Sequence, residues 1–463
     1  HWVCRMRVIG TEPSDVQKNL RAKDGSKIML RQKIIDKTAK LGVVGMGYVG
    51  LPLGVEFAAS GLEVVGFEVD TAKADSLNRG ESYIEDISSE QLKPLVESGV
   101  FSATTDFDAL SDMDVISICV PTPLSKTRDP DMSYVMTATE AIAKRLRKGQ
   151  LVILESTTYP GTTTELIQPT LEATGLKAGE DFYLAFSPER VDPRNPTYGI
   201  RNTPKVVGGI DEESTSLSHL FYSIGIDEVM AVSSAEAAEM AKLLENTFRS
   251  VNIGLVNELA IMCDRLGCDV WEVIDAAATK PFGFMKFVPG PGLGGHCIPI
   301  DPFYLSWKLR TLNYRARFIE LAGEVNSEMP AYVVRLVGDT LNDDCKSVKG
   351  ARILMVGIAY KNDVADMRES PALDIYKLLE DRGAEVSFTD PYVDSFRQGD
   401  GTVEGVPLTK ETLEAADLVV ITCKHSDVDF SLVARHARAI VDTRNALPRG
   451  TENAKLAKRL VHL

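Results

Sequence analysis

Residues 41–50 read Leu41-Gly42-Val43-Val44-Gly45-Met46-Gly47-Tyr48-Val49-Gly50, a short apolar run that leads into three glycines spaced G-x-G-x-x-G. This pattern is typical of a β-strand that turns tightly into an α-helix. Gly45 permits the turn, Gly47 lets a pyrophosphate approach the backbone, and Gly50 lets the helix pack closely on the strand. Because the first N–H groups of that helix have no partner within it, they favour an anion. The stretch therefore predicts a dinucleotide-binding α/β domain.

An acidic side chain follows the glycine turn at the distance that ribose recognition uses. Glu68 ends an expected strand, Glu63–Phe67, about 20 residues beyond the turn, where a carboxylate binds the ribose hydroxyls. Since this carboxylate would repel a 2′-phosphate, it favours NAD over NADP. Asp70 lies two residues later on the same face of the strand and is the alternative ribose ligand.

Strands and helices alternate in two regions of the chain. The first region has expected strands at 41–44, 63–67, 114–120, 151–155, 182–186, 205–208 and 228–232. The second has them at 352–358, 385–389, 417–422 and 439–442, with helices at 371–383, 410–416 and 430–437. Helical patterns between these regions cover 234–267, with Ser233 or Ser234 as its cap, 269–279 and 316–342. The rhythm predicts an α/β protein with two Rossmann-like, doubly wound parallel-sheet domains joined by a long central helix and a helical region.

These patterns divide the chain into four expected parts. They are an N-terminal arm at 1–37, an NAD-binding Rossmann domain at 38–233, a central helical domain at 234–343 and a second Rossmann-like domain at 344–463. The first turn of the last domain, at 356–359, lacks the glycine fingerprint, so we expect the two α/β domains to take different ligands. A Gly- and Pro-rich loop at 280–301 interrupts the helical domain, and loops of this length usually carry function.

The composition excludes several classes of protein. The chain has 463 residues, of which 44% are hydrophobic and 25% charged, so it is a globular rather than a disordered protein. Its net charge of −15 disfavours nucleic acid as a main partner. Seven cysteines without a C-x-x-C pair argue against a disulfide scaffold or a cysteine-rich zinc site, and they fit a reducing, cytoplasmic location. No apolar run reaches the roughly 18 residues of a membrane span.

Cys297 is the strongest candidate for a nucleophile. It lies in the segment 290–301, Gly-Pro-Gly-Leu-Gly-Gly-His-Cys-Ile-Pro-Ile-Asp, where glycines leave room for a substrate carbon beside an ionised thiol. The alternative is an inert loop cysteine, and the neighbouring Asp301 and glycines argue against it. His296 adjoins Cys297 in the sequence, but adjacent loop residues often point apart, so its direct catalytic role is the less favoured hypothesis.

The long helix carries a polar stripe. Glu239, Lys242, Asn246 and Arg249 are spaced by three, four and three residues, which places them on one face. Such a stripe is usually a solvated face. Lys242 and Asn246 could instead direct a cation and an amide group into a cleft.

Polar residues also follow three expected strands, in the segments 119–123, 155–161 and 186–190. In each segment, the polar residues could simply form the turn that ends the strand. Because open parallel sheets bind ligands at the carboxyl ends of their strands, the three segments together indicate a ligand site.

Several motifs in order make the chain similar to the nucleotide-sugar 6-dehydrogenases, the UDP-glucose/GDP-mannose dehydrogenase family. They are GMGYVG (45–50), CVPTP (119–123), ESTTYPGTT (155–163), FSPER (186–190), AKLLENTFRSVNI (241–253), GGHCIPIDP (294–302) and DMRESP (366–371). The resemblance extends from Leu41 to Arg444 and so covers nearly the whole chain.

Details within these motifs resemble most the family members that act on UDP-N-acetylglucosamine, through 186–190, Asn195-Pro196 and 296–304. Enzymes for UDP-glucose usually carry a lysine where this chain has Ile300, and a second acid where it has Pro193. Enzymes for UDP-N-acetylmannosamine share the His-Cys pair, so the resemblance leaves the sugar open.

The resemblance implies a four-electron oxidation of the sugar C6 hydroxyl. NAD takes one hydride to leave an aldehyde, Cys297 adds to the aldehyde as a thiohemiacetal, and a second NAD takes another hydride to leave a thioester that water hydrolyses to the uronate. Lys242 is then expected to stabilise oxyanions, Asn246 to orient the reacting oxygen and water, and Asp301 to assist proton transfer. Thr157 and Glu189 complete the set, with Glu189 as a base or a water-orienting group.

The resemblance also implies the binding residues and partners. The cofactor is expected on Gly45, Gly47, Tyr48, Val49, Gly50, Glu68, Lys73, Thr122 and Thr157. The UDP-sugar is expected on Glu189, Arg190, Lys242, Asn246, Phe282, Gly295, Lys361 and Arg444, with the last two as cations near the pyrophosphate and the second α/β domain taking most of the UDP. A homodimer or dimer-based oligomer is implied, without nucleic acid, membrane or metal.

Two other classes of function share parts of this pattern. A non-catalytic nucleotide-sugar-binding protein would have no use for Cys297. A two-electron β-hydroxyacid dehydrogenase would need neither Cys297 nor the second α/β domain. The number of NADH molecules formed per sugar separates the three hypotheses.

Overall fold

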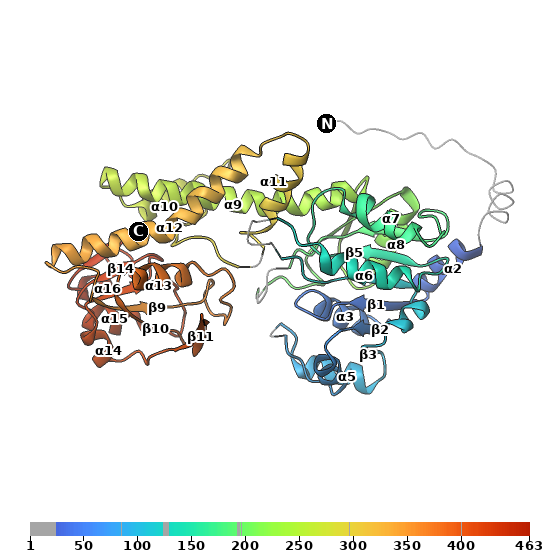
Figure 1. Cartoon of the computed structure of the whole chain (residues 1–463), viewed down its shortest axis with the longest axis horizontal. Coiled ribbons are helices and arrows are strands. Elements are labelled where there is room, and N and C mark those ends of the chain that lie inside the picture. Colours follow the sequence, from blue (N-terminus) through green and yellow to red (C-terminus); the bar gives the residue numbers. More distant parts are fainter. Residues whose placement is uncertain are drawn as a thin grey trace. The chain divides into compact units, whose positions relative to one another are not determined.

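The computed structural model describes residues 25–84, 86–123, 129–191, 195, 197–295, 297–399 and 401–463, the side chains of 25–28 excepted. The chain forms two compact units that divide between Lys242 and Leu243, and each unit has a sheet of its own (Figure 1). The first 24 residues of the expected arm, together with Pro193, Pro196 and His296, lie outside the described residues.

The first unit is built on an eight-stranded sheet with the strand order β3-β2-β1-β4-β5-β6-β7-β8. The strands are β1 (Lys40–Val44), β2 (Glu63–Phe67), β3 (Phe101–Thr104), β4 (Val115–Ile118), β5 (Leu151–Leu154), β6 (Tyr183–Phe186), β7 (Lys205–Gly209) and β8 (Val229–Ala231). Only β3 was not predicted among them, because its short sequence Phe-Ser-Ala-Thr at the edge of the sheet has little apolar signal.

The register of the central strands aligns their carboxyl ends. Val44 of β1 lies opposite Phe67 of β2 and Ile118 of β4. Leu154 of β5 lies opposite Ile118 and also opposite Phe186 of β6. The segments that follow these five strands therefore begin at one edge of the sheet, where open α/β sheets bind their ligands.

Strand β7 corrects the prediction of a wholly parallel sheet. It pairs antiparallel with β6, with Ala185 opposite Gly209, and β8 then pairs parallel with β7. Among the described residues between β6 and β7 there is no helix, and an antiparallel neighbour needs no crossover helix. The remaining strand pairs of this sheet are parallel, as predicted.

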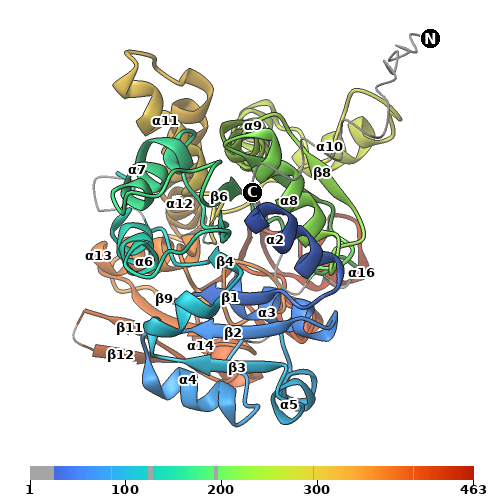
Figure 2. The same ribbon diagram turned by 90° about the vertical axis from the view of Figure 1, so that its right-hand side faces the viewer.

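Helices cover both faces of this sheet, which makes it doubly wound (Figure 2). One face packs against α2 (Gly25–Ile35), α3 (Gly50–Ala59) and α8 (Glu212–Tyr222), where the Phe57 and Phe221 rings stack at 4.6 Å. The other face packs against α6 (Ser133–Ala143), the π-helix η2 (Thr163–Ile167) and α7 (Gln168–Glu172). The short helices α4 (Thr71–Asn78), α5 (Ser89–Glu97) and η1 (Phe107–Asp112) complete the unit.

The long helix α9 (Ala235–Leu266) confirms the predicted central helix. The Ser234 hydroxyl accepts the Ala237 N–H at 3.2 Å, so Ser234 is the cap. Helices α10 (Val270–Ala278) and α12 (Arg317–Asp343) also follow the prediction. Helix α11 (Asp301–Thr311) was not predicted, because its apolar residues do not gather on one face.

The second unit has a five-stranded sheet with the order β10-β9-β13-β14-β15, and its paired strands are parallel. Its strands are β9 (Arg352–Val356), β10 (Glu385–Thr389), β13 (Leu418–Ile421), β14 (Ile440–Asp442) and β15 (Leu460–His462). Its helices are α13 (Pro371–Asp381), α14 (Lys410–Ala415), α15 (Phe430–His436) and α16 (Glu452–Leu456), and β11 (Ser395–Gln398) pairs with β12 (Gly401–Glu404). The sequence did not predict β11, β12, β15 or α16. The two sheets confirm the predicted fold class of two Rossmann-like domains.

No helix in the described part of the chain combines the length and the apolar character that crossing a membrane requires.

Asp114 joins three segments at the amino-terminal edge of the first sheet. One oxygen contacts Lys33 Nζ at 2.9 Å and Arg147 Nη2 at 2.8 Å, and the other accepts the Lys40 N–H at 3.1 Å. Although burial alone would raise it, these donors hold the pKa of Asp114 below its usual value. The side chain is therefore an ionised, shared acceptor.

We expect Asp114→Ala to lower the free energy of unfolding by about 2–3 kcal/mol, because two cations and one N–H lose their acceptor. Asp112→Ala removes an exposed carboxylate two residues away and is the matched control, with little expected effect. Denaturant titration of both full-length variants measures the difference. Equal stability of the two variants would contradict the role of Asp114.

Candidate active site

The glycine turn after β1 forms an open cradle at the start of α3. Gly45 has a φ of 94°, and its N–H donates to the Phe67 carbonyl at 2.9 Å. A Cβ on Gly50 would overlap the Gly45 carbonyl oxygen, whereas a Cβ on Gly47 would meet nothing within 4 Å. Open space over Gly47, beside the first N–H groups of α3, fits the pyrophosphate of a dinucleotide. Tyr48 and Val49 lie between these two glycines.

Glu68 lies beside this turn. One carboxylate oxygen accepts the Met46 N–H at 3.3 Å, and the other accepts the N–H groups of Val69 and Asp70 at 2.9 and 3.2 Å. Asp70, the alternative ribose ligand, caps α4 instead by accepting the Ala72 N–H at 2.9 Å. Of the two acids, Glu68 is therefore the one in contact with the glycine turn.

Lys73 and Thr122 lie near the same edge of the sheet. Lys73 Nζ lies 5.6 Å from the centre of the Tyr83 ring, and the Tyr83 hydroxyl donates to the Met46 carbonyl at 2.8 Å. Thr122 is buried in the segment that follows β4. The glycine turn, α4 and the segments that follow β2 and β4 thus begin at the edge of the sheet where the cofactor is expected.

Lys242 and Thr157 are in direct contact. Lys242 Nζ donates to the Thr157 hydroxyl at 2.5 Å, and the lysine is only 6% exposed. Thr157 follows β5, and Lys242 belongs to the part of α9 that packs in the first unit. The structure thus brings together two of the predicted catalytic residues.

Glu189 follows β6 and is held as a carboxylate. Its Oε1 accepts the N–H groups of Arg190 and Val191 at 2.8 and 2.7 Å, and its Oε2 lies 3.5 Å from Lys205 Nζ. Burial raises the pKa of Glu189, but the Lys205 and Lys242 cations and these N–H groups hold it below its usual value. An ionised Glu189 suits a base or a water-orienting group and not an acid. Arg190 Nη1 donates to the Pro204 carbonyl at 2.6 Å.

Glu155 and Lys205 form a buried ion pair under Glu189, and Lys205 was not singled out from the sequence. Lys205 Nζ contacts Glu155 Oε2 at 2.6 Å, with side-chain exposures of 6% and 0%. The hydroxyls of Ser117 and Tyr222 both donate to Glu155 Oε1 at 2.7 Å. The signal available in the sequence was a lysine at the start of the otherwise apolar strand Lys-Val-Val-Gly-Gly.

The polar stripe of α9 is not a solvated face along its whole length. Glu239 is 1% exposed and accepts the N–H groups of Gly161 and Thr163 at 2.6 and 2.9 Å, which fixes the start of η2. Burial raises the pKa of Glu239 to about 7 despite these donors. Arg249 is exposed. Glu239 therefore has a structural contact, while Lys242 and Asn246 contact predicted catalytic residues.

In the second unit, Asn246 and Asp301 form the corresponding contact. Asn246 Nδ2 donates to Asp301 Oδ2 at 2.5 Å, and Asp301 is 1% exposed. The exposed Cys297 begins the turn that leads into α11, since its carbonyl accepts the Ile300 and Asp301 N–H groups at 3.0 and 2.8 Å.

The glycines before Cys297 allow close backbone packing. A Cβ on Gly290 would lie 2.5 Å from Arg444 Nη1, and one on Gly295 would lie 2.8 Å from the Tyr360 ring. The Gly290 N–H donates to Asn257 of α9 at 2.9 Å, and the Gly295 N–H donates to the Arg368 carbonyl at 3.0 Å. This packing brings the loop that contains the predicted substrate residue Gly295 against the C-terminal domain, which carries Arg444 and, after Tyr360, Lys361.

Phe282 lies apart from that packing. Its side chain is 71% exposed, and Lys280 Nζ lies 5.0 Å from the centre of its ring. The structure therefore does not bury it among the other predicted substrate residues of the second unit.

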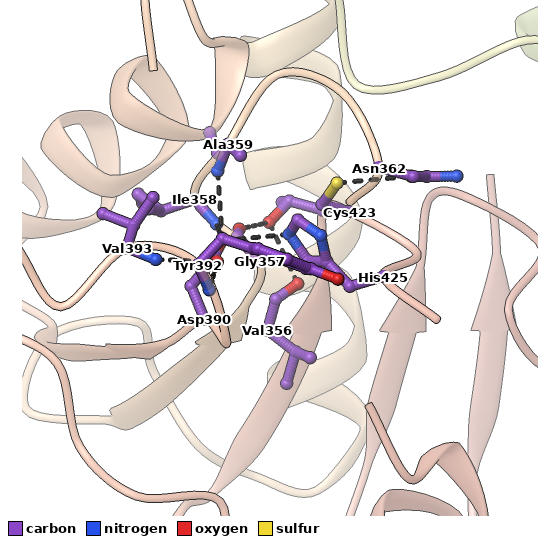
Figure 3. A network of polar contacts seen from close by, with 12 residues as sticks. Val356, Gly357, Ile358, Ala359, Asn362, Asp390, Tyr392, Val393, Cys423 and His425 are labelled. Atoms are coloured by element: carbon purple, nitrogen blue, oxygen red, sulfur yellow. Dashed lines mark hydrogen bonds and ion pairs between the residues drawn. The ribbon is translucent and has the colours of Figure 1, made fainter. Parts of the chain in front are cut away.

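The first turn of the C-terminal sheet is filled by a carboxylate (Figure 3). Asp390 Oδ2 accepts the N–H groups of Ile358 and Ala359 at 2.7 and 3.2 Å, and Oδ1 accepts those of Tyr392 and Val393 at 2.8 and 3.2 Å. Burial opposes ionisation, but His425 and these N–H groups hold the pKa of Asp390 below its usual value. The two domains differ at this turn as the sequence indicated.

No group of three or more His, Cys, Asp or Glu residues in the described ranges is arranged to hold a metal ion.

Three family models match the chain in order. They are the NAD-binding domain (39–224), the central domain (236–328) and the UDP-binding domain (354–449) of the UDP-glucose/GDP-mannose dehydrogenase family. The chain is 35% identical over 414 residues to the UDP-N-acetyl-D-mannosamine dehydrogenase of Pyrococcus horikoshii, covering 88% of this chain and 96% of that one. It is 36% identical over 396 residues to the UDP-N-acetyl-D-glucosamine 6-dehydrogenase of Pseudomonas aeruginosa, covering 84% and 92%.

A solved structure of the UDP-D-ManNAc dehydrogenase from Pyrococcus horikoshii also resembles the chain. The TM-score is 0.82 at 33% identity, and the match covers 91% of this chain and 98% of that one.

We expect Gly47→Ala to fold normally but to bind NAD about tenfold more weakly or worse, because its methyl group enters the space that fits the pyrophosphate. Gly50→Ala should instead lower the melting temperature, since its Cβ overlaps the Gly45 carbonyl. Gly199→Ala is the matched control, at an exposed glycine with open space around it. Calorimetric titration with NAD and thermal melting distinguish the three variants. Wild-type NAD affinity in Gly47→Ala would contradict the assignment of this turn to the pyrophosphate.

Proposed function

Because the chain belongs to the UDP-glucose/GDP-mannose dehydrogenase family, we propose that it oxidises the C6 hydroxyl of UDP-N-acetylglucosamine to the carboxylate. The coarser statement follows from the family: the chain is an NAD-dependent UDP-sugar dehydrogenase. We assign 38–233 to NAD, 234–343 to the catalytic loop and its helices, and 344–463 to the UDP-sugar. UDP-N-acetylmannosamine and UDP-glucose are the alternative substrates, and a non-catalytic nucleotide-sugar-binding protein is a distant one.

Two contacts on α9 carry the proposal. Lys242 and Asn246 lie one helical turn apart, and they bind Thr157 and Asp301 respectively at 2.5 Å. The Thr157 hydroxyl fixes the direction of the Lys242 ammonium group, and the buried Asp301 carboxylate fixes the direction of the Asn246 amide. Such preorganised donors suit the stabilisation of developing negative charge on a reacting oxygen.

The proposed mechanism uses Cys297 as a covalent relay. NAD, when bound, supplies the hydride acceptor for each of the two oxidations. The Cys297 thiolate adds to the aldehyde carbon after the first oxidation, and the second oxidation converts that thiohemiacetal to a thioester. Water then cleaves the C–S bond, releasing the carboxylate and restoring the thiol. The sugar loses four electrons in total.

Other residues of the chain have supporting roles in this proposal. Lys242 neutralises the oxyanion on C6, and Asn246 orients the reacting oxygen and the water. Asp301 assists proton transfer to and from water, and its contact with Asn246 couples the two. The ionised Glu189 accepts a hydrogen bond from the water or acts as its base.

The choice of sugar rests on single positions. Ile300, where UDP-glucose enzymes usually have a lysine, is 9% exposed and offers an apolar contact. The motif Phe186–Arg190 resembles that of the N-acetylglucosamine enzymes. Phe282 and Phe284 are 71% and 41% exposed, and aromatic rings of this kind could cover an acetamido methyl group.

We propose that the enzyme is a cytoplasmic homodimer or dimer-based oligomer. Large apolar side chains on α9 are exposed at helical spacing: Leu244, Phe248, Leu255, Met262 and Leu266. A second copy of the chain would cover such a stripe. The described cysteines, Cys119, Cys263, Cys268, Cys297, Cys345 and Cys423, form no disulfide with one another, which fits a reducing compartment.

The substrate proposal is tested by the specificity constants for UDP-N-acetylglucosamine, UDP-N-acetylmannosamine and UDP-glucose with NAD. UDP-glucose should be the poorest by about 10-fold or more, because it leaves the acetamido volume empty and its polar partner unpaired. Counting NADH per sugar should give two. One NADH would indicate a simple two-electron dehydrogenase, and none would indicate a binding protein. Preference for UDP-glucose would overturn the N-acetyl proposal and leave the family assignment intact.

We expect Cys297→Ser to bind NAD and UDP-sugar but to lose about 100-fold or more of its steady turnover, because an alkoxide does not replace the thiolate in the relay. Cys268→Ser, at an exposed cysteine in the turn after α9, is the matched control and should retain full turnover. Turnover of Cys297→Ser close to wild type would show that this thiol is not the nucleophile.

A further inference from the structure

His425 is a buried imidazole that joins two separate parts of the C-terminal domain. Its Nε2 lies 3.0 Å from Asp390 Oδ2, and both side chains are fully buried (Figure 3). Its Nδ1 accepts the Asp363 N–H at 2.9 Å. Because Nδ1 accepts this N–H, the ring proton is on Nε2, which donates a hydrogen bond to Asp390. The imidazole therefore connects the carboxylate of the first turn to the backbone of the loop that comes after that turn.

The residues around His425 hold the same loop. Asn362 Oδ1 accepts the Lys424 N–H at 3.1 Å and the Cys423 thiol at 3.3 Å. Asp363 Oδ1 accepts the N–H and the hydroxyl of Ser426 at 2.7 and 3.0 Å. We call the segment 423–426 the clamp. It fixes the two residues that come directly after Lys361.

Asp363 shows that this conformation is imposed on the loop. Its φ is 61°, a left-handed value that non-glycine residues rarely adopt. Such a conformation persists where surrounding contacts over-determine it. The clamp and the imidazole supply those contacts at both the backbone and the side chain of Asp363.

Arg444 is held by Thr422, the residue that precedes the clamp. Its Nε donates to the Thr422 carbonyl at 2.9 Å, and its backbone N–H donates to Asp442 Oδ1 at 3.0 Å. The two residues after Lys361, and Arg444 itself, are thus held by the segment 422–426 that follows β13. The turn itself has its Ile358 and Ala359 N–H groups committed to Asp390, so the phosphates depend on side-chain cations.

We propose that His425 and Asp390 are positioning residues for the nucleoside diphosphate. Asp390 replaces a phosphate at the first turn and anchors His425. Through Nδ1, His425 keeps the loop 361–363 in the conformation that presents Lys361, together with Arg444, to the two phosphates of UDP. This inference rests on the proposed UDP-sugar substrate and adds two residues that do not touch the reacting atoms.

The test is calorimetric titration of the full chain with UDP and, separately, with NAD. His425→Gln can direct its amide NH2 toward Asp390, but it has no acceptor at the position of Nδ1, so the Asp363 N–H loses its partner. We expect it to weaken UDP binding about tenfold while NAD affinity stays unchanged, since the NAD-binding turn belongs to the other unit. His436→Gln is the matched control. It removes the imidazole at the end of α15, which pairs with Glu414 of α14 at 3.2 Å, and should bind UDP normally.

Asn362→Ala keeps the test decisive if His425→Gln does not fold. Its side chain is exposed, so its loss should spare the fold, yet it removes the acceptor for two contacts of the clamp. Weaker UDP binding with normal NAD binding in either variant supports the proposal. Wild-type UDP affinity in both variants would overturn it and leave the proposed function standing. Equal losses of UDP and NAD binding would also overturn it, because unfolding would then explain both. A wild-type chain that does not bind UDP would refute the proposed function itself.

Discussion

Parallel strand pairing in register is the constraint on which the chemistry of the first unit depends. Since Val44, Phe67, Ile118, Leu154 and Phe186 end their strands side by side, the residues that come after them begin at one edge. The glycine turn, Glu68, Thr122, Thr157 and Glu189 all come from these segments. Polar groups can therefore gather at the carboxyl-terminal edge of the sheet, while its two faces stay apolar under the helices.

Buried charge explains how a chain with a net charge of −15 offers cations to an anionic ligand. Lys205 is paired with Glu155 at 2.6 Å inside the first unit, and its second carboxylate neighbour is Glu189. Burial disfavours each charge alone, and the pairing makes the ionised forms stable together. The Lys205 and Lys242 cations together hold the pKa of Glu189 below its usual value despite burial, so local arrangement and not net charge decides which groups are ionised at the site.

The two Rossmann-like domains differ in what accepts the backbone N–H groups of their first turn. A turn at the carboxyl end of a parallel strand leaves backbone N–H groups that need an acceptor. In the first unit the space over Gly47 stays open for an external anion. In the second unit Asp390 occupies the corresponding turn, and the imidazole of His425 extends that contact to a neighbouring loop. One fold thereby yields two domains with different ligands.

Local sequence determined much of this protein, because strands, helices, caps and the glycine turn depend on residues close together in the chain. It predicted the two α/β domains, a serine cap at Ser233 or Ser234, and the turn at Gly45–Gly50 with Glu68. It also gave Lys242, Asn246 and Cys297 as candidates. Tertiary structure alone decided the direction of β7, the role of Glu239 in fixing η2, and the pairing of Lys205 with Glu155, which lie 50 residues apart. It also decided that Asp390 fills the C-terminal turn and that His425 reaches Asp363, 62 residues away in the chain. The physical reason is that a buried charge or imidazole takes its role from the partners that folding brings to it, and no local pattern specifies those partners.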